Sequence, residues 1–104
     1  MTLNSLQKIL DGVKGVAHCY GYFPDNQDPP YICYYSTNSN PIFSDGIIIY
    51  NEESIIMKLV TQYRDLAAEC YIDRMLTESG VQYKKNYEAD AEQKIHSVEY
   101  QFTV

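Results

Sequence analysis

The sequence is short of features that mark several common protein classes. It has 3 cysteines, Cys19, Cys33 and Cys70, and they lack the paired spacing of zinc ligands or of a disulfide framework. We therefore predict that the cysteines are buried as small apolar residues, with Cys33 in a strand and Cys70 in a helix. Such cysteines fit a protein of a reducing compartment.

Basic residues are also scarce. The chain has 8 Lys and Arg against 14 Asp and Glu, which gives a net charge of −6. The basic footprint of a nucleic-acid-binding domain is therefore absent, and an acidic surface repels DNA. Lys84 and Lys85, beside Tyr83 and Tyr87, form the only basic–aromatic cluster. We interpret it as a solvated strand edge protected by lysines rather than as a base-stacking surface.

Long apolar runs are missing as well. The longest, Ile47-Ile48-Ile49-Tyr50, has the length of a strand, whereas a membrane span needs about 20 apolar residues. The first residues include Asn4, Gln7, Lys8 and Asp11, which argues against a signal peptide. We therefore expect a protein without a membrane partner.

Motifs for catalysis or cofactor binding are not found. Gly15 and Gly21 are isolated and make no phosphate-binding loop. His18 and Cys19 are adjacent, so on a strand their side chains point to opposite faces and cannot form a catalytic pair with each other. We interpret His96 as a partly buried structural histidine. The sequence thus predicts no catalytic, cofactor-binding or metal-binding residues and no cofactor.

Two pairs of acidic residues lie in segments rich in turn-forming residues. Asp25 and Asp28 flank prolines in one loop, and Asp90 and Glu92 lie in the last turn. One pair of carboxylates is too few for a calcium site, so we interpret these residues as solvated turn residues.

What the chain does contain is enough for one modest core. At 104 residues it has the size of a single domain, and 45% of its residues are apolar. Its 11 tyrosines favour half-buried strands, and they also suit surfaces that meet partners.

The first half of the chain predicts one helix followed by strands. Residues 2–14 carry an apolar stripe with Thr2 or Asn4 as the N-cap and Gly15 as the end. The stripe consists of Leu3, Leu6, Ile9 or Leu10, and Val13. Strands are expected at residues 16–23, 31–36, 47–50 and 54–62, with loops at residues 24–30 and 37–46 and a turn at residues 51–53.

The second half predicts a helix and a final pair of strands. Asp65 is the expected N-cap, Gly80 supplies the C′ position, and the apolar helix stripe is Ala68, Ile72, Met75 and Leu76, which Leu66 can join. Glu69, Asp73 and Glu78 are expected to point away from that stripe. A strand follows at residues 81–85. In the last strand, residues 95–104, one face should meet the core: His96, Val98, Tyr100, Phe102 and Val104.

This order of elements predicts one α+β domain over residues 1–104. Its two layers are a mainly antiparallel sheet and two helices packed on one face of that sheet.

Several of these segments together resemble a known family. They are Pro30-Tyr-Ile-Cys-Tyr-Tyr, Phe43-Ser-Asp-Gly, Ser54-Ile-Ile-Met-Lys-Leu-Val-Thr, Asp65 with Glu69, Gly80-Val-Gln-Tyr, Glu92, and Tyr100-Gln-Phe. Over about residues 29–104 the chain resembles the small tail-terminator or tail-completion proteins of long-tailed phages and prophages. It departs from the family pattern at Ser44 and Gly46 in the turn, and at Val60, where an aromatic residue is frequent.

The resemblance implies a structural virion protein and not an enzyme. Such proteins form rings, typically of six subunits, that cap the head-proximal end of the tail tube and join the tail to the head. The implied partners are further copies of the chain, the tail tube protein and the head–tail connector. DNA would pass through the ring without specific binding. The implied location is the tail–head junction of the virion, after synthesis in the cytoplasm of the bacterial host.

Three alternatives remain open at this point. Another neck component, such as a head-closure or adaptor protein, belongs to the same class. A small sheet-based module that binds nucleic acid or protein belongs to another, and strong salt-dependent DNA binding would identify it. A small enzyme is disfavoured, because no paired acid and base or activated nucleophile is found.

Overall fold

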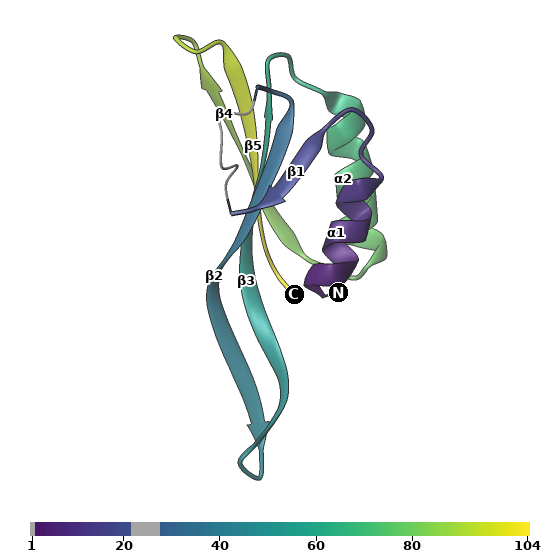
Figure 1. Cartoon of the computed structure of the whole chain (residues 1–104), viewed down its shortest axis with the longest axis vertical. Coiled ribbons are helices and arrows are strands. Elements are labelled where there is room, and N and C mark those ends of the chain that lie inside the picture. The colour runs from purple at the N-terminus through teal and green to yellow at the C-terminus, as the bar shows by residue number, and fades with distance from the viewer. Residues whose placement is uncertain (1, 22–27) are drawn as a thin grey trace.

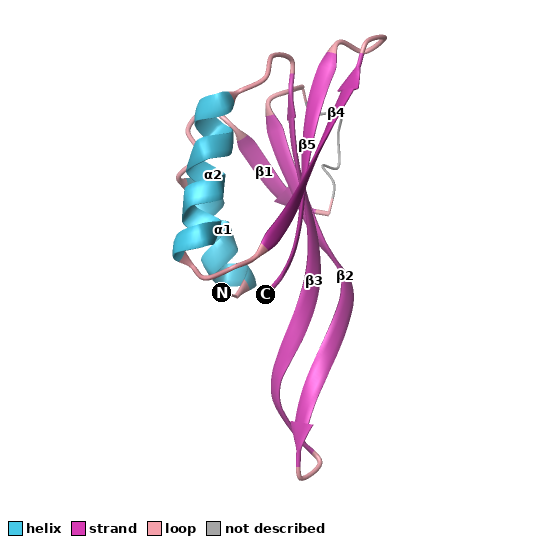
Figure 2. Cartoon of the chain, turned by 180° about the vertical axis from the view of Figure 1, so that it is seen from behind, coloured by secondary structure: helices cyan, strands magenta, loops and turns pink. Residues whose placement is uncertain are grey.

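One five-stranded sheet carries both helices on the same face, as Figures 1 and 2 show. The computed structural model describes residues 2–21 and 28–104. The elements are α1 (Leu3–Asp11), β1 (Ala17–Tyr20), β2 (Tyr31–Ser44), β3 (Ile47–Thr61), α2 (Leu66–Glu78), β4 (Tyr83–Asp90) and β5 (Ile95–Thr103). The strand order is β1-β2-β3-β5-β4, and only the β1–β2 pair is parallel. The predicted α+β class, with a mainly antiparallel sheet and both helices on one face, is confirmed.

The first helix is shorter than its sequence pattern predicts. Thr2 is the N-cap, and its hydroxyl accepts the Ser5 N–H at 3.2 Å. The helix ends at Asp11 with Gly12 as C-cap, so the predicted extension to Gly15 is wrong. Packing against α2 explains the early end. The Tyr71 hydroxyl donates to the Ile9 carbonyl at 3.2 Å, and a Cβ at Gly12 would collide with that hydroxyl.

The second helix follows its predicted boundaries. Asp65 is the N-cap, and its carboxylate accepts the Ala68 N–H at 3.0 Å. Gly80 takes the left-handed conformation just past the helix, at φ 76°, where a side chain would be strained. Ala68, Ile72 and Leu76 are buried as predicted, whereas Leu66 is 59% exposed because it lies in the first turn, outside the stripe.

The core lies between the helices and one face of the sheet. Val98, Tyr100 and Phe102 of β5 are buried there, which confirms the predicted core face of this strand. His96 opens the same face but is exposed, so its predicted partial burial is wrong. The strand begins at Ile95, and its first residues lie beyond the cover of α2 (Figure 1). The rest of the core comes mainly from Leu6 and Leu10 of α1, Ile32 and Tyr34 of β2, and Ile55, Met57 and Leu59 of β3.

The middle of the chain forms one long hairpin instead of loops and short strands. β2 and β3 pair from Tyr31 with Val60 to Ser44 with Ile47. The loop predicted at residues 37–46 and the turn predicted at residues 51–53 are therefore wrong. The actual turn is Asp45-Gly46, with φ of 53° and 77°, which suits a two-residue hairpin turn with positive φ at both positions.

Two other boundaries also differ from the prediction. β1 covers residues 17–20 of the predicted strand 16–23, and Tyr22 and Phe23 lie outside the described residues. β4 extends to Asp90, beyond the predicted end at Lys85, because its pairing with β5 continues to the turn. Residues 24–27 of the predicted loop also lie outside the described residues, while Asp28, Pro29 and Pro30 precede β2 without strand structure.

Candidate assembly surface

The β2–β3 hairpin extends far beyond the strands that flank it. β1 pairs with β2 only at Tyr31–Tyr34, and β5 pairs with β3 only over residues 54–61. Residues 38–52 therefore form a two-stranded ribbon that projects from the body in Figures 1 and 2, and we call it the arm. It makes the molecule 53 Å long and 22 Å thick. The radius of gyration is 14.9 Å, whereas about 13 Å is expected for a compact domain of this length.

A β-bulge marks the root of the arm. The register shifts between Ser36 and Asn38, so Thr37 is an extra residue on β2. The Thr37 hydroxyl donates to the Ser54 carbonyl at 3.3 Å and holds the bulge in place. Bulges bend a strand and increase its local twist, which gives the ribbon a direction different from that of the sheet.

The arm exposes apolar side chains near its tip. Phe43 is 59% exposed and Ile47 is 68% exposed. A two-stranded ribbon alone is marginally stable in water, and its outer edges present unpaired backbone groups. An arm with these properties gains stability when a partner covers its apolar side chains and pairs with its edge.

A second open edge lies beside the arm root. The Glu53 and Val104 backbones exchange two hydrogen bonds of 2.9 Å. Because successive residues of an antiparallel strand direct their N–H and C=O groups to opposite sides, those of Thr103 point away from β3. β4 pairs with β5 only from Tyr83 opposite Phe102 onward, so the pairing of β4 stops short of Thr103.

A groove of about 850 Å³ lies beside Thr103, where the pairing of β4 with β5 ends. It is lined by β3, by the end of β5 and by the α2–β4 connection, and it reaches Thr37 and Ser54 at the arm root. Phe102 and Val81 supply apolar surface, while Lys84 and Gln82 supply polar groups. The groove therefore offers apolar and polar side chains beside an open backbone edge, which are the features that an added strand requires.

The face of the sheet opposite the helices is polar and of mixed charge. One row across the strands consists of Cys19, Cys33, Lys58, Glu99 and Asn86, which are paired in register. Glu99 also accepts a hydrogen bond from the Gln101 amide at 2.9 Å. This alternation of charge differs from the continuous basic stripe of a nucleic-acid surface.

The residues considered for chemistry are dispersed. His18 lies on the helix side, with its Nε2 2.7 Å from Asp11 Oδ1, and Cys19 lies on the opposite face, as predicted for neighbours on a strand. Asp25 lies outside the described residues, and Asp28 is exposed. Asp90 Oδ1 accepts the Glu92 and Gln93 N–H groups, which confirms a turn role for Asp90.

The predicted burial of the cysteines is wrong. Cys70 is exposed because it lies on the outer face of α2, and Cys19 and Cys33 are half-buried because they lie on the open face of the sheet. Within residues 2–21 and 28–104, no group of three or more His, Cys, Asp or Glu side chains is arranged to hold a metal ion.

The basic–aromatic cluster is divided between the two faces of β4. Lys84 is exposed on the open face, whereas Tyr83, Lys85 and Tyr87 are directed toward α2. Lys85 is therefore not a solvated edge lysine, and that interpretation is wrong for it. Its ammonium lies 5.4 Å from the ring centres of both Tyr87 and Tyr100.

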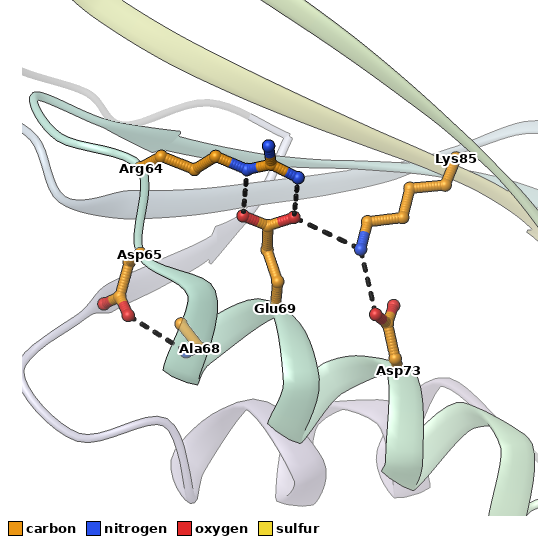
Figure 3. Close-up of polar contacts among 6 residues, drawn as sticks. All are labelled: Arg64, Asp65, Ala68, Glu69, Asp73 and Lys85. Atoms are coloured by element: carbon orange, nitrogen blue, oxygen red, sulfur yellow. Dashed lines mark hydrogen bonds and ion pairs between the residues drawn. The ribbon is translucent and has the colours of Figure 1, made fainter.

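A charge cluster around the buried Glu69, where α2 meets β4, was not predicted from the sequence (Figure 3). Glu69, expected only to point away from the apolar stripe of α2, is 2% exposed. Its carboxylate lies 3.2 Å from Arg64 Nε and 3.2 Å from Lys85 Nζ, and Lys85 Nζ lies 2.9 Å from Asp73 Oδ2. We call Arg64, Glu69, Asp73 and Lys85 the charge cluster.

The surroundings of Lys85 favour its charged form. Burial alone lowers the pKa of Lys85, but its hydrogen bonds to Asp73 and Glu69 and its position beside Tyr87 and Tyr100 raise that pKa overall. Burial and the nearby Asp73 charge raise the pKa of Tyr100, so its hydroxyl stays protonated. Because both carboxylates are engaged by cations, the cluster clamps α2 onto β4 and does not provide an acid–base pair.

Comparisons with known proteins add no family. Neither a scan against protein-family models nor a search of curated proteins finds a match to this chain. Within the described part of the chain, neither helix has the length and apolar character needed to cross a membrane.

Proposed function

We propose that this protein is a ring-forming structural subunit that caps the head-proximal end of a phage tail tube and joins the tail to the head. Two arguments support the proposal. The sequence from residue 29 onward resembles tail-terminator proteins, and the fold carries an arm and an open sheet edge suited to contacts between subunits. The observation that carries the proposal is the arm, residues 38–52, which pairs with no third strand among the described residues and exposes Phe43 and Ile47.

The positions of the arm and the groove support a head-to-tail contact between subunits. The tip of the arm is at one end of the molecule (Figure 2). The groove reaches Thr37 and Ser54 at the arm root, so the tip and the groove cannot meet within one chain. In a ring the arm of one subunit reaches the groove of the next and pairs with Thr103. Such head-to-tail contacts close when the rotation between subunits permits it. The charges are complementary, since Asp45 is exposed at the tip and Lys84 lines the groove.

The proposed partners are further copies of the chain, the tail tube protein and the head–tail connector. The proposed location is the tail–head junction of the virion. The net charge of −6 suits an inner wall that repels passing DNA instead of binding it.

Site-directed cross-linking tests the arm-to-groove contact. In a variant without the native cysteines, Ser44→Cys at the tip and Gln82→Cys in the groove are combined and oxidised at high protein concentration. We expect covalent multimers whose series ends at one ring size. Ala91→Cys, at the exposed turn between β4 and β5, replaces Gln82→Cys in the matched control and should give no such series. Equal cross-linking in both variants would contradict the contact.

A charge placed on the apolar tip tests assembly directly. Phe43→Asp should abolish rings seen by negative-stain microscopy and light scattering, while Ala91→Asp adds the same charge at a distant turn and should leave them intact. In the phage or prophage, deletion of the gene should give filled heads without tails, or tails of irregular length. Normal infectious particles after deletion would refute the tail-joining role, and strong salt-dependent DNA binding would favour the binding-module alternative.

A further inference from the structure

Two cysteines lie side by side on the open face of the sheet. Cys19 of β1 and Cys33 of β2 are in-register partners of the parallel pair, so their side chains share one face. Both are thiols and half-buried. On its other side, Cys33 is paired in register with Lys58 of β3. Burial and the Cys19 thiol raise the pKa of Cys33, and Lys58 opposes that rise.

The backbone geometry allows these two thiols to join. Partners on neighbouring strands have Cα atoms about 4.8 Å apart, and disulfides form across Cα separations of about 4.4–6.8 Å. The Cβ atoms must approach to about 3.8 Å, which requires a small shift of one strand. β1 can make that shift, because it has only four residues and is paired on one side alone.

We infer that Cys19 and Cys33 form a redox-modification site, which a low-molecular-weight disulfide such as glutathione disulfide converts into an intramolecular disulfide. One thiolate attacks glutathione disulfide, so a mixed disulfide forms and one glutathione leaves. The second thiolate attacks the protein sulfur of that mixed disulfide and expels the second glutathione. The two cysteines are oxidised, one glutathione disulfide is reduced to two glutathiones, and each departing thiolate takes one of the protons released by the cysteines.

The bond would attach the edge strand β1 covalently to β2. β1 also carries His18, which contacts Asp11 at the end of α1, so the link would connect the α1–β1 unit to the sheet. The required shift of the strand stores strain, and strained disulfides are reduced more easily than relaxed ones. The site is therefore suited to reversible oxidation. Cys70 is exposed on α2 and lies in another element, so replacing it with serine leaves only the two sheet cysteines to react.

The experiment exposes the folded full-length protein to glutathione disulfide and measures intact mass and remaining thiols. The Cys70→Ser variant should lose both thiols, carry no glutathione, remain monomeric on a non-reducing gel, and recover both thiols with excess reduced glutathione. Two matched controls remove the second thiol. Cys19→Ser with Cys70→Ser, and Cys33→Ser with Cys70→Ser, should each keep one glutathione that is not expelled.

Every other outcome overturns the inference. Retention of glutathione on Cys70→Ser would show that the second attack does not occur. Disulfide-linked dimers would show that the thiols meet those of another copy instead of each other. Thiols that stay unmodified after prolonged exposure would show that the site is closed to the reagent. Alanine in place of serine at each position repeats the test if a serine variant fails to fold.

Discussion

Loss of Lys85 should destabilise the protein more than loss of its neighbour Lys84. In the Lys85→Met variant the aliphatic volume is retained but the ammonium between two carboxylates disappears. Removal of one partner from a fully buried ion pair costs about 3–5 kcal/mol. The Glu69 side chain is 3% exposed and keeps Arg64, while the Asp73 side chain is 31% exposed and loses its ion-pair partner. We therefore expect the lower end of the range, about 3 kcal/mol.

Urea unfolding followed by circular dichroism and tyrosine fluorescence measures this difference, since the chain has 11 Tyr and no Trp. A domain of this size has a free energy of unfolding of about 5–15 kcal/mol, so the variant should still fold at low temperature. Lys84→Met is the matched control. Lys84 is exposed on the open face, so its loss should change the stability by no more than about 0.5 kcal/mol.

A second substitution gives a further criterion. In Lys85→Met the buried Glu69 carboxylate keeps Arg64 as an ion-pair partner but loses the Lys85 ammonium. Addition of Glu69→Gln removes that carboxylate charge and should therefore recover part of the loss. A defect below about 1 kcal/mol, or one equal to that of Lys84→Met, would refute the clamp role.

Three further predictions concern single side chains. Phe102→Ala should cost about 3–5 kcal/mol in urea unfolding, because Phe102 is 5% exposed; a loss below about 1 kcal/mol would place it outside the core. Asp65→Ala should cost about 1 kcal/mol through loss of the N-cap, whereas Asp65→Asn should retain most of the stability. Tyr100→Phe should be neutral or stabilising near neutral pH, because the buried Tyr100 hydroxyl lacks a hydrogen-bond partner among the described residues. The raised pKa of Tyr100 means that stability falls as the pH rises above about 10, and Tyr100→Phe should weaken that fall; an unchanged alkaline profile would contradict this reasoning.

The helices and the last strand were predictable because each buries one face. The stripe of α2 and the alternation of β5 both report on a single core, and Asp65 and Gly80 carry local capping chemistry that needs no tertiary information. The C-terminal end of α1 was less predictable. The helix ends at Asp11, where Tyr71 docks beside the C-cap Gly12, and a contact from a distant helix leaves no periodic signal near position 12.

The arm was not predicted, because its strands do not bury one face against the core as α2 and β5 do. Residues 37–44 are solvated on both faces for much of their length, so they lack the alternation that identifies a strand. Asn38, Ser39, Asn40 and Pro41 therefore resemble a loop in composition. The Asp45-Gly46 dipeptide was the available signal, since it favours a two-residue hairpin turn between strands.

The charge cluster required pairing information that no local pattern contains. Glu69 and Asp73 are four residues apart on α2, so they share a face. That face is buried only because Lys85 lies opposite it on β4, next to β5. The alternation of Tyr83, Lys85 and Tyr87 indicated a shared face, but not which helix that face would meet.

Because no other strand in the described part of the chain pairs with the arm, its local stability differs from that of the body. Proteins open in cooperative units, and units with few buried contacts open at little cost in free energy. Amide hydrogens of residues 38–52 should therefore exchange with solvent through brief openings that leave the body folded. Mutations at the tip can then change how the arm meets a partner while the melting of the body stays the same. The bulge at Thr37 therefore separates the packed body from a ribbon that can open on its own.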